Sequence, residues 1–396
     1  RSDRFDVFST NPTTGGVVQV FQYQVGHQEE ITLEMETPGV RQLDLHGLEG
    51  DDLFNLSGPQ PITSILIDGG DPSASDHVSI GGDGTPMIVG IGDGTPAITG
   101  GGFHDVDLLG VELLDVNMPS GGADLSVRTS IFDDAVEVTP TGADSGLVRA
   151  NDVNPLVRFF NSAVFDVRLG SGEDSLVVHG GETAETIGVS GTAVAIAGKV
   201  TVNYAQAEAL SVLGHEGGDT FNVTPADVPI SVDGGAPGAS DALVIAGDAS
   251  GTPLPATDFA VVNHSRRPGE GTVRVFRSAV AMPDVSYTDV EVVAPLVDPV
   301  DPNSGDPNLL VLGPDLYEEN EYRATAAFLG MGETLNVANL AIFPNAAEHP
   351  FVPEDHDYFR VVAQETGTLD FTVYFRTFDP GLLPGGGNIN IEVLDA

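Results

Sequence analysis

The stretch QLDLHGLEGDDLFNL at residues 42–56 decides the fold, because it returns as ALSVLGHEGGDTFNV at residues 209–223. Each copy is followed by a matching tail, ILIDGGDPSASDHVSI at 65–80 and ISVDGGAPGASDALVI at 230–245. A shorter copy, FDVRLGSGEDSLVV, lies at 165–178. Such self-similarity is typical of stacked structural repeats, in which each repeat buries its apolar face against its neighbours.

Within these repeats, apolar residues alternate with polar ones and then meet Gly, Asp, Asn or Pro, as at Ile65 and Ile67 or Val136 and Val138. A period of two predicts short, half-buried strands, and residues 1–290 show no convincing helical period. Short strands joined by turns of recurring chemistry predict an all-β, repeat-containing β-solenoid of the parallel β-helix type. A β-sandwich array is the alternative.

The repeats predict an acidic all-β region at 1–295, with copies at about 3–130 (including an insertion), 131–180 and 181–290. A Pro- and Asp-rich linker is expected at 296–313. Beyond it, at 314–396, aromatic residues become denser and the segments DYFRVVA and LDFTVYF alternate cleanly. This change of texture predicts a separate small β-sandwich.

The charge balance excludes several classes of protein. The chain carries 59 acidic against 15 basic side chains, a net charge of −44, with Lys199 as its single lysine. A phosphate backbone would be repelled, so nucleic acid is not an expected partner. No apolar run is long enough for a membrane span. The absence of cysteine excludes disulfides and thiolate metal sites. We expect a secreted, extracellular or cell-surface protein, since this acidity suits a saline or calcium-rich setting.

The acidic turns carry a first resemblance. EGDDLF, GEDSL and GGDTF share a Gly-x-Asp-x-apolar pattern that resembles one turn of the hemolysin-type (RTX) calcium-binding repeat. That resemblance implies Ca²⁺ held by turn carboxylates, since Ca²⁺ prefers oxygen ligands. The alternative is that Asp simply suits tight, solvated turns. The candidate ligands in the turns and in the DGG…D tails are Glu49, Asp51, Asp52, Asp68, Asp76, Asp174, Asp219, Asp233 and Asp241.

A second resemblance covers the last 80 or so residues. YEENEYRATAAFLGMG, DHDYFRVVA and the closing IEVLDA resemble the bacterial pre-peptidase C-terminal (PPC) domain. That family implies an extracellular, jelly-roll-like module that can bind Ca²⁺. Carried over by position, the candidate ligands are Glu318, Glu319, Asn320, Asp355 and Asp357. The repeat region is also similar to long acidic proteins of bacterial cell surfaces.

Together these features predict a calcium-stabilised structural protein of the bacterial surface rather than an enzyme. Neither end has a polar capping helix, so we expect either a longer parent chain or ends that pair head-to-tail with other copies, giving a filament, surface layer or adhesin stalk. Other cell-surface components are further expected partners. The alternative is a β-helix polysaccharide lyase or hydrolase that uses clustered carboxylates such as Asp51 and Asp52. A third interpretation is an array of carbohydrate-binding modules. Against it, the chain has no Trp to stack on sugar rings.

Overall fold

The computed structural model describes residues 2–294 with gaps at 12–14, 23–29, 71–74, 93, 120–121, 236–240, 253, 255–257, 265–268, 278–279 and 291, together with 309–311, 327–331 and 359–362. These residues form strands and turns only, so the predicted all-β class is confirmed. No helix able to cross a membrane occurs among them. The expected linker and C-terminal sandwich, including Glu318, Glu319, Asn320, Asp355 and Asp357, lie outside the described residues apart from three short strands.

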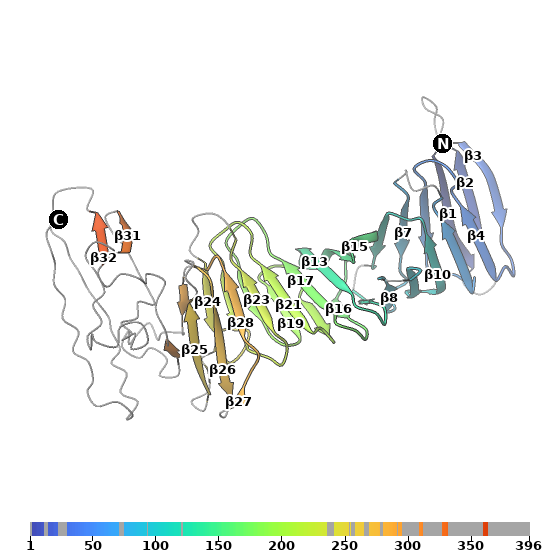
Figure 1. The fold of residues 1–396 in the computed structure, drawn as a ribbon. Coiled ribbons are helices and arrows are strands. Elements are labelled where there is room, and N and C mark those ends of the chain that lie inside the picture. The colour runs from blue at the N-terminus through green and yellow to red at the C-terminus, as the bar shows by residue number, and fades with distance from the viewer. Residues whose placement is uncertain are drawn as a thin grey trace.

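Two large mixed sheets face each other along an elongated molecule (Figure 1). The first, sheet A, contains β1 (Asp3–Asn11), β2 (Gly15–Gln22), β3 (Glu30–Glu36), β5 (Leu53–Ser57), β7 (His77–Gly81), β11 (Leu113–Asn117), β13 (Ala135–Gly142), β14 (Ser145–Ala150), β15 (Val153–Phe160), β17 (Ser175–His179), β21 (Ala209–Leu213), β23 (Ile230–Asp233), β25 (Asp258–His264), β26 (Gly271–Arg277), β27 (Val280–Ala281), β28 (Val285–Thr288) and β30 (Leu309–Val311).

The second, sheet B, contains β4 (Gln42–His46), β6 (Ser64–Asp68), β8 (Met87–Gly90), β9 (Ala97–Gly100), β10 (Phe103–Leu109), β12 (Asp124–Arg128), β16 (Val164–Arg168), β18 (Thr186–Val189), β19 (Ala193–Ile196), β20 (Val202–Ala205), β22 (Thr220–Val223), β24 (Ala242–Ile245) and β29 (Val292–Ala294). A separate pair consists of β31 (Ala327–Met331) and β32 (Phe359–Val362).

Outside the antiparallel meanders, the chain crosses from one sheet to the other at each turn, and strands from successive crossings pair in parallel. This solenoid pattern is interrupted by antiparallel three-strand meanders, which fall in alternate sheets. They are β1–β2–β3 in sheet A, β8–β9–β10 in B, β13–β14–β15 in A, β18–β19–β20 in B, and β25–β26–β28 in A.

A meander followed by its parallel strands makes one unit, so the described strands before β30 form five units. They cover 3–81, 87–128, 135–179, 186–245 and 258–294. The segment expected as an insertion within 3–130 is thus a unit of its own, with its meander in sheet B. A repeated phrase can therefore occupy either sheet. Residues 42–56 form β4 in sheet B and β5 in sheet A, whereas the matching 209–223 form β21 in A and β22 in B.

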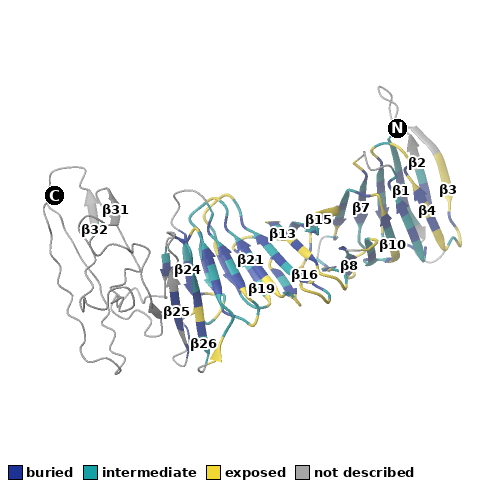
Figure 2. Ribbon diagram, in the orientation of Figure 1, coloured by how far each residue is buried: buried dark blue, intermediate teal, exposed yellow. Residues whose placement is uncertain are grey.

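Alternating side chains from both sheets fill one hydrophobic core along the described units (Figure 2). In sheet A the inward residues Phe54, Val78 and Leu114 stack in register across neighbouring parallel strands. Phe159 of β15 and Phe165 of β16 bridge the sheets, with ring centroids 4.3 Å apart. Each buried side chain of this size contributes about 1.5–3 kcal/mol, so the stacked strands stabilise one another along the length of the molecule.

Candidate functional site

The predicted calcium ligands divide into buried and outward-facing carboxylates. Five of them immediately precede a strand and are at most 1% exposed, namely Asp52, Asp76, Asp174, Asp219 and Asp241. Each occupies the corner where the chain enters its strand, and its side chain turns inward.

At these corners, the carboxylate of one acidic residue accepts a hydrogen bond from the backbone N–H of another acidic residue at the start of the neighbouring strand. The Asp52 N–H donates to Oδ1 of Asp76 at 2.8 Å, and the Asp76 N–H donates to Oε2 of Glu112 at 2.7 Å. We call such a series an acidic ladder. Counting only residues that directly precede a strand, the three ladders are Asp52–Asp76–Glu112, Asp134–Asp174–Glu208 and Glu185–Asp219–Asp241, with bonds of 2.7–2.8 Å throughout. Asp52 also accepts the backbone N–H of Asp3, the first residue of β1.

Glycines make room for the ladder carboxylates. A Cβ at Gly214 would lie 2.5 Å from Oδ2 of Asp219, five residues later, and Gly47 has the same relation to Asp52. Gly69 and Gly234 face Asp76 and Asp241, each seven residues later. The recurring spacing from Gly to Asp is therefore a packing requirement of the inward-turned carboxylate.

The ladders concentrate buried carboxyl groups and so shift their pKa values. Burial raises the pKa of Asp52 to about 6, despite the opposing hydrogen bond from the Asp3 backbone, and the nearby Asp76 adds to the rise. Burial likewise raises the pKa of Asp76, Asp174, Asp219 and Asp241, while a backbone hydrogen bond lowers each. Desolvation of the charged form thus outweighs the hydrogen bond.

The second carboxylate oxygen is less well satisfied. Oδ2 of Asp52, Asp76, Asp174 and Asp219 is buried with no hydrogen-bond partner. In the third ladder a lysine side chain acts as a nearby cation, since Lys199 lowers the pKa of Asp219. Nζ of Lys199 lies 2.7 Å from Oε1 of Glu185 at the start of that ladder. The single lysine of the chain therefore compensates one end of a buried acidic row.

The remaining predicted ligands in the repeats face outward and do not converge. Glu49 and Asp51 are exposed, and Asp51 Oδ1 accepts the Ser75 N–H at 3.1 Å. Asp68 Oδ2 lies 3.1 Å from Nδ1 of His46, while Asp233 Oδ1 accepts the Gly235 N–H at 3.1 Å. Among the described residues, no group of three or more His, Asp or Glu side chains is arranged to hold a metal ion. Asp51 is exposed, whereas its neighbour Asp52 is buried.

The sequence interpretation missed four ladder members, Glu112, Asp134, Glu185 and Glu208. None of them lies in a Gly-x-Asp turn. Their shared signal is position, since each directly precedes the first residue of a strand, as Asp52 does. A search for acidic residues directly before segments of alternating apolar residues would have identified them.

Two histidines meet on the third ladder's side of the molecule. Nδ1 of His179 and Nε2 of His215 are 3.0 Å apart, and the ring planes are nearly parallel at 13° with centroids 5.2 Å apart. Burial, and then the neighbouring His215, lower the pKa of His179. The pair is thus a hydrogen bond that one neutral ring donates and the other accepts, and protonation of both rings would break it.

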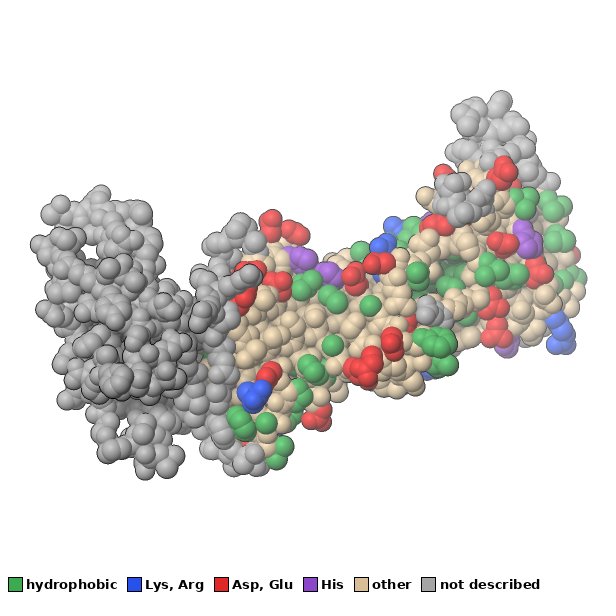
Figure 3. Space-filling view, viewed as in Figure 1, with side chains coloured by type: hydrophobic (Ala, Val, Ile, Leu, Met, Phe, Trp, Pro, Cys, Tyr) green, Lys and Arg blue, Asp and Glu red, His purple; other side chains and the backbone are tan. Residues whose placement is uncertain are grey.

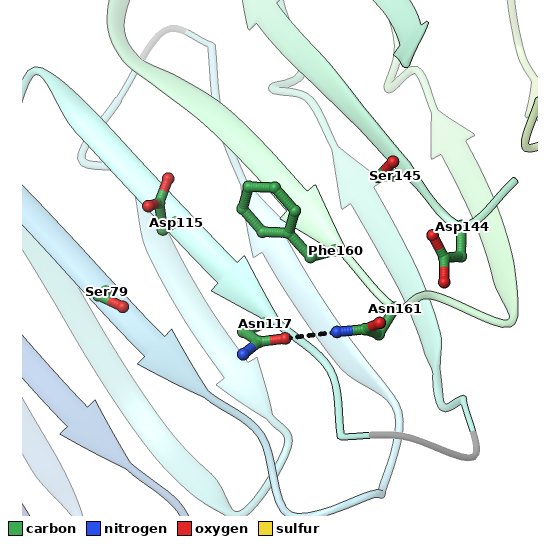
Figure 4. Close-up of a pocket in the computed structure, with 7 residues that line it drawn as sticks. All are labelled: Ser79, Asp115, Asn117, Asp144, Ser145, Phe160 and Asn161. Atoms are coloured by element: carbon green, nitrogen blue, oxygen red, sulfur yellow. Dashed lines mark hydrogen bonds between the residues drawn. The ribbon is translucent and has the colours of Figure 1, made fainter. Parts of the chain in front are cut away.

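A polar network crosses the outer face of sheet A. Asp115 of β11 receives a two-pronged hydrogen bond from Arg158 of β15, at 2.6 and 2.7 Å, and Nε2 of His77 on β7 lies 3.0 Å from its Oδ2. Beside Asp115 a pocket opens toward the ends of β11 and β15 (Figure 4). None of these residues was singled out from the sequence, because they come from three separate strands.

Comparison with known proteins adds no relative: no family model, no curated protein and no solved structure matches this chain.

Proposed function

We propose that this chain is a structural protein of the bacterial surface whose copies join head-to-tail into a filament, surface layer or adhesin stalk, stabilised by Ca²⁺. The observation that carries the proposal is a pair of open strand edges at one end of the molecule. Strands β3 and β4 end the two sheets there, and each has one strand neighbour among the described residues, β2 and β6 respectively (Figure 1).

The edge strand β3 also leaves an apolar face uncovered. Met35 pairs with the buried Val18 of β2, yet its side chain is 45% exposed, and Leu33 on the same face is 53% exposed. Open edges with exposed apolar side chains favour strand addition from another chain. At the opposite end of sheet B, β29 likewise has one neighbour, β24, among the described strands. A second copy offers edges for both positions.

The outward-facing carboxylates are the groups that would bind Ca²⁺ where two copies meet. Acidic side chains are scattered along the visible face with few basic ones between them (Figure 3). Glu49 and Asp51 lie in the turn that follows β4, close to the open end. Crowded carboxylates from two copies would repel each other without a divalent ion, and Ca²⁺ takes oxygen ligands from flexible turns.

The test measures size and melting temperature of the purified chain with about 2 mM Ca²⁺ and then with a chelator. We expect Ca²⁺ to raise the melting temperature and to promote growth into fibres or sheets, seen by light scattering and electron microscopy. Replacing Leu33→Lys together with Met35→Lys should stop growth. The matched control, Leu109→Lys, changes a residue that is 42% exposed on β10 and should leave growth unchanged. A monodisperse monomer in Ca²⁺ would overturn the assembly, and an unchanged melting temperature would overturn the role of calcium.

A further inference from the structure

The pocket on the outer face of sheet A has a volume of about 340 Å³ and lies between β7, β11 and the β14–β15 hairpin. Figure 4 shows its lining side chains, which mix one aromatic ring with polar groups. They are Ser79, Asp115, Asn117, Asp144, Ser145, Phe160 and Asn161. This volume is at the lower end of the range for small-molecule sites.

Phe160 is the unusual member of this lining. It is a large aromatic residue at the end of a strand, yet it is 39% exposed beside polar side chains. Phe159, its neighbour in sequence, is fully buried in the core. An aromatic face that stays in contact with water in a polar pocket offers a flat apolar surface to a ligand that carries both apolar C–H groups and polar groups.

The amide and hydroxyl groups around Phe160 supply both donors and acceptors. Nδ2 of Asn161 donates to Oδ1 of Asn117 at 2.8 Å, which fixes both side chains. This bond leaves the Nδ2 group of Asn117 and Oδ1 of Asn161 without a protein partner among the described residues. The Asp144 carboxylate is exposed at the rim. Hydroxyl groups can satisfy all of these, because each hydroxyl both donates and accepts.

The charge of the pocket argues against an anionic ligand. Asp115 and Asp144 are both acidic, and the Arg158 guanidinium is held by Asp115 rather than facing the cavity as a lining residue. An anion would therefore meet carboxylates first. A neutral molecule with many hydroxyl groups would instead donate hydrogen bonds to them, and hydrogen bonds to charged acceptors are the stronger kind.

We propose that this pocket binds a neutral saccharide, with one sugar ring against Phe160 and its hydroxyl groups hydrogen-bonded to Asn117, Asn161 and Asp144. Outward-facing polar side chains continue from Ser79 in register to Asn55 and Asp6 on the next two strands. Adjacent strands are about 4.7–4.9 Å apart, so an oligosaccharide lying across them meets one polar side chain per strand. The chain thus carries a glycan-binding site, whether or not it assembles head-to-tail.

The test uses soluble neutral tetrasaccharides of glucose, mannose, xylose, galactose and N-acetylglucosamine, each titrated against the purified chain by saturation-transfer NMR and calorimetry. We expect at least one to bind with Kd of about 0.1–1 mM. Phe160→Ala and Asn117→Ala should each weaken that binding by roughly tenfold or more, a loss of about 1.4 kcal/mol. Phe132→Ala is the matched control, because Phe132 is 58% exposed in the turn before β13 and outside the pocket.

Three outcomes would overturn the proposal. The first is that none of the tetrasaccharides binds at about 10 mM, the limit of useful affinity. The second is that Phe160→Ala and Phe132→Ala weaken binding equally. The third is that a chelator abolishes binding, which would assign recognition to a metal ion rather than to these side chains. Circular dichroism spectra and melting temperatures matching the parent chain would show that lost binding in a variant is not lost folding.

Discussion

The two copies of the repeated phrase, at 42–81 and 209–245, build the same corner on opposite sheets. In each copy a residue with positive φ, Leu48 at 77° or His215 at 73°, precedes the ladder aspartate. In each, a Cβ on a glycine of the next turn, Gly70 or Gly235, would overlap the carbonyl oxygen of that residue. The corner geometry is therefore self-contained and does not depend on which sheet follows it.

The copies differ in what the positive-φ residue presents outside the corner. Leu48 is 70% exposed, whereas His215 is hydrogen-bonded to His179. The ladder behind the second copy also has Lys199 as a counter-ion, while no lysine or arginine is among the influences on Asp52 or Asp76. The two copies therefore share the backbone geometry of the corner. They differ in the side chains that this geometry does not constrain.

The largest expected effect comes from the glycine that both copies need. Gly70→Ala and Gly235→Ala each place a Cβ onto a backbone carbonyl at a φ of 108° or 95°. Because backbone must move, we expect each to lower the free energy of unfolding by roughly 3–5 kcal/mol, and by similar amounts in the two copies. Urea denaturation followed by circular dichroism measures this.

Gly198→Ala is the control for backbone strain alone. Gly198 has a φ of 78°, but a Cβ there would meet nothing within 4 Å. Its cost should be about 1 kcal/mol. A loss at Gly70 no greater than at Gly198, or a large difference between Gly70 and Gly235, would contradict the equivalence of the two corners.

A smaller effect is expected from the charge of the ladder. The pKa of Asp52 is about 6 in the folded chain, above its ordinary value, so folding binds a proton in the interval between the two values. The resulting stability is fully present below about pH 4 and is lost as pH rises through about 6. Asp52→Asn keeps a hydrogen-bond acceptor but removes the charge. It should raise the free energy of unfolding by about 1–3 kcal/mol at pH 7 and change it little at pH 4.

Asp51→Asn serves as the comparison for this prediction, because Asp51 is the exposed neighbour of Asp52. It removes the same formal charge from a residue outside the hydrogen bonds of the ladder, and its effect should stay within about 0.5 kcal/mol. Melting temperatures recorded between pH 4 and pH 8 would separate the two. Destabilisation of the chain by Asp52→Asn at pH 7 would contradict this prediction, because it would mean that the charged carboxylate stabilises the fold there.

The smallest expected effect exchanges the residue that distinguishes the copies. His215→Leu introduces the residue of the first copy and removes the hydrogen bond to His179, at a cost of about 0.5–1.5 kcal/mol at pH 7.5. The lowered pKa of His179 means that its stabilising effect is present above the ordinary histidine pKa and is lost as pH falls. The variant should therefore lose less stability between pH 7.5 and pH 5 than the parent does.

Hydrogen exchange of β17 and β21, measured by mass spectrometry at both pH values, resolves this local effect. His104→Leu, which changes an exposed histidine on β10, should not alter the pH dependence. Equal behaviour of the two variants would mean that the histidine pair does not respond to pH.

Much of the fold could be predicted from the sequence, because it rests on local patterns. Period-two alternation and the repeated Gly and Asp turns indicate short strands and corners. The meander in the middle of 3–130 was not recognised as the start of a separate unit, because its place in sheet B depends on distant pairings such as that of Val106 on β10 with Ile65 on β6. For the same reason the candidate pocket was missed, because register across β7, β11 and β15 brings its side chains together.

The direction in which the aspartate side chains point could not be predicted from the sequence either. The Gly-x-Asp pattern suits an outward calcium ligand and an inward ladder equally well. Only the packing of Gly47 or Gly214 against the carboxylate distinguishes the two. The prediction that these carboxylates bind Ca²⁺ therefore stays a prediction, now separated into outward residues such as Asp51 and buried ones such as Asp52.

The alternation of the meanders imposes a parity on the array. Each unit delivers the chain to the sheet opposite the one in which its own meander lies, so the five meanders fall in the order A, B, A, B, A. Loss or duplication of a single unit would move every downstream strand to the opposite sheet, with its buried face still toward the shared core. A surface feature such as the Phe160 pocket would then point to the other side of the rod. Gain or loss of two units together keeps every downstream strand in its original sheet. Changes by pairs of units are therefore the ones that leave each surface feature on its original side.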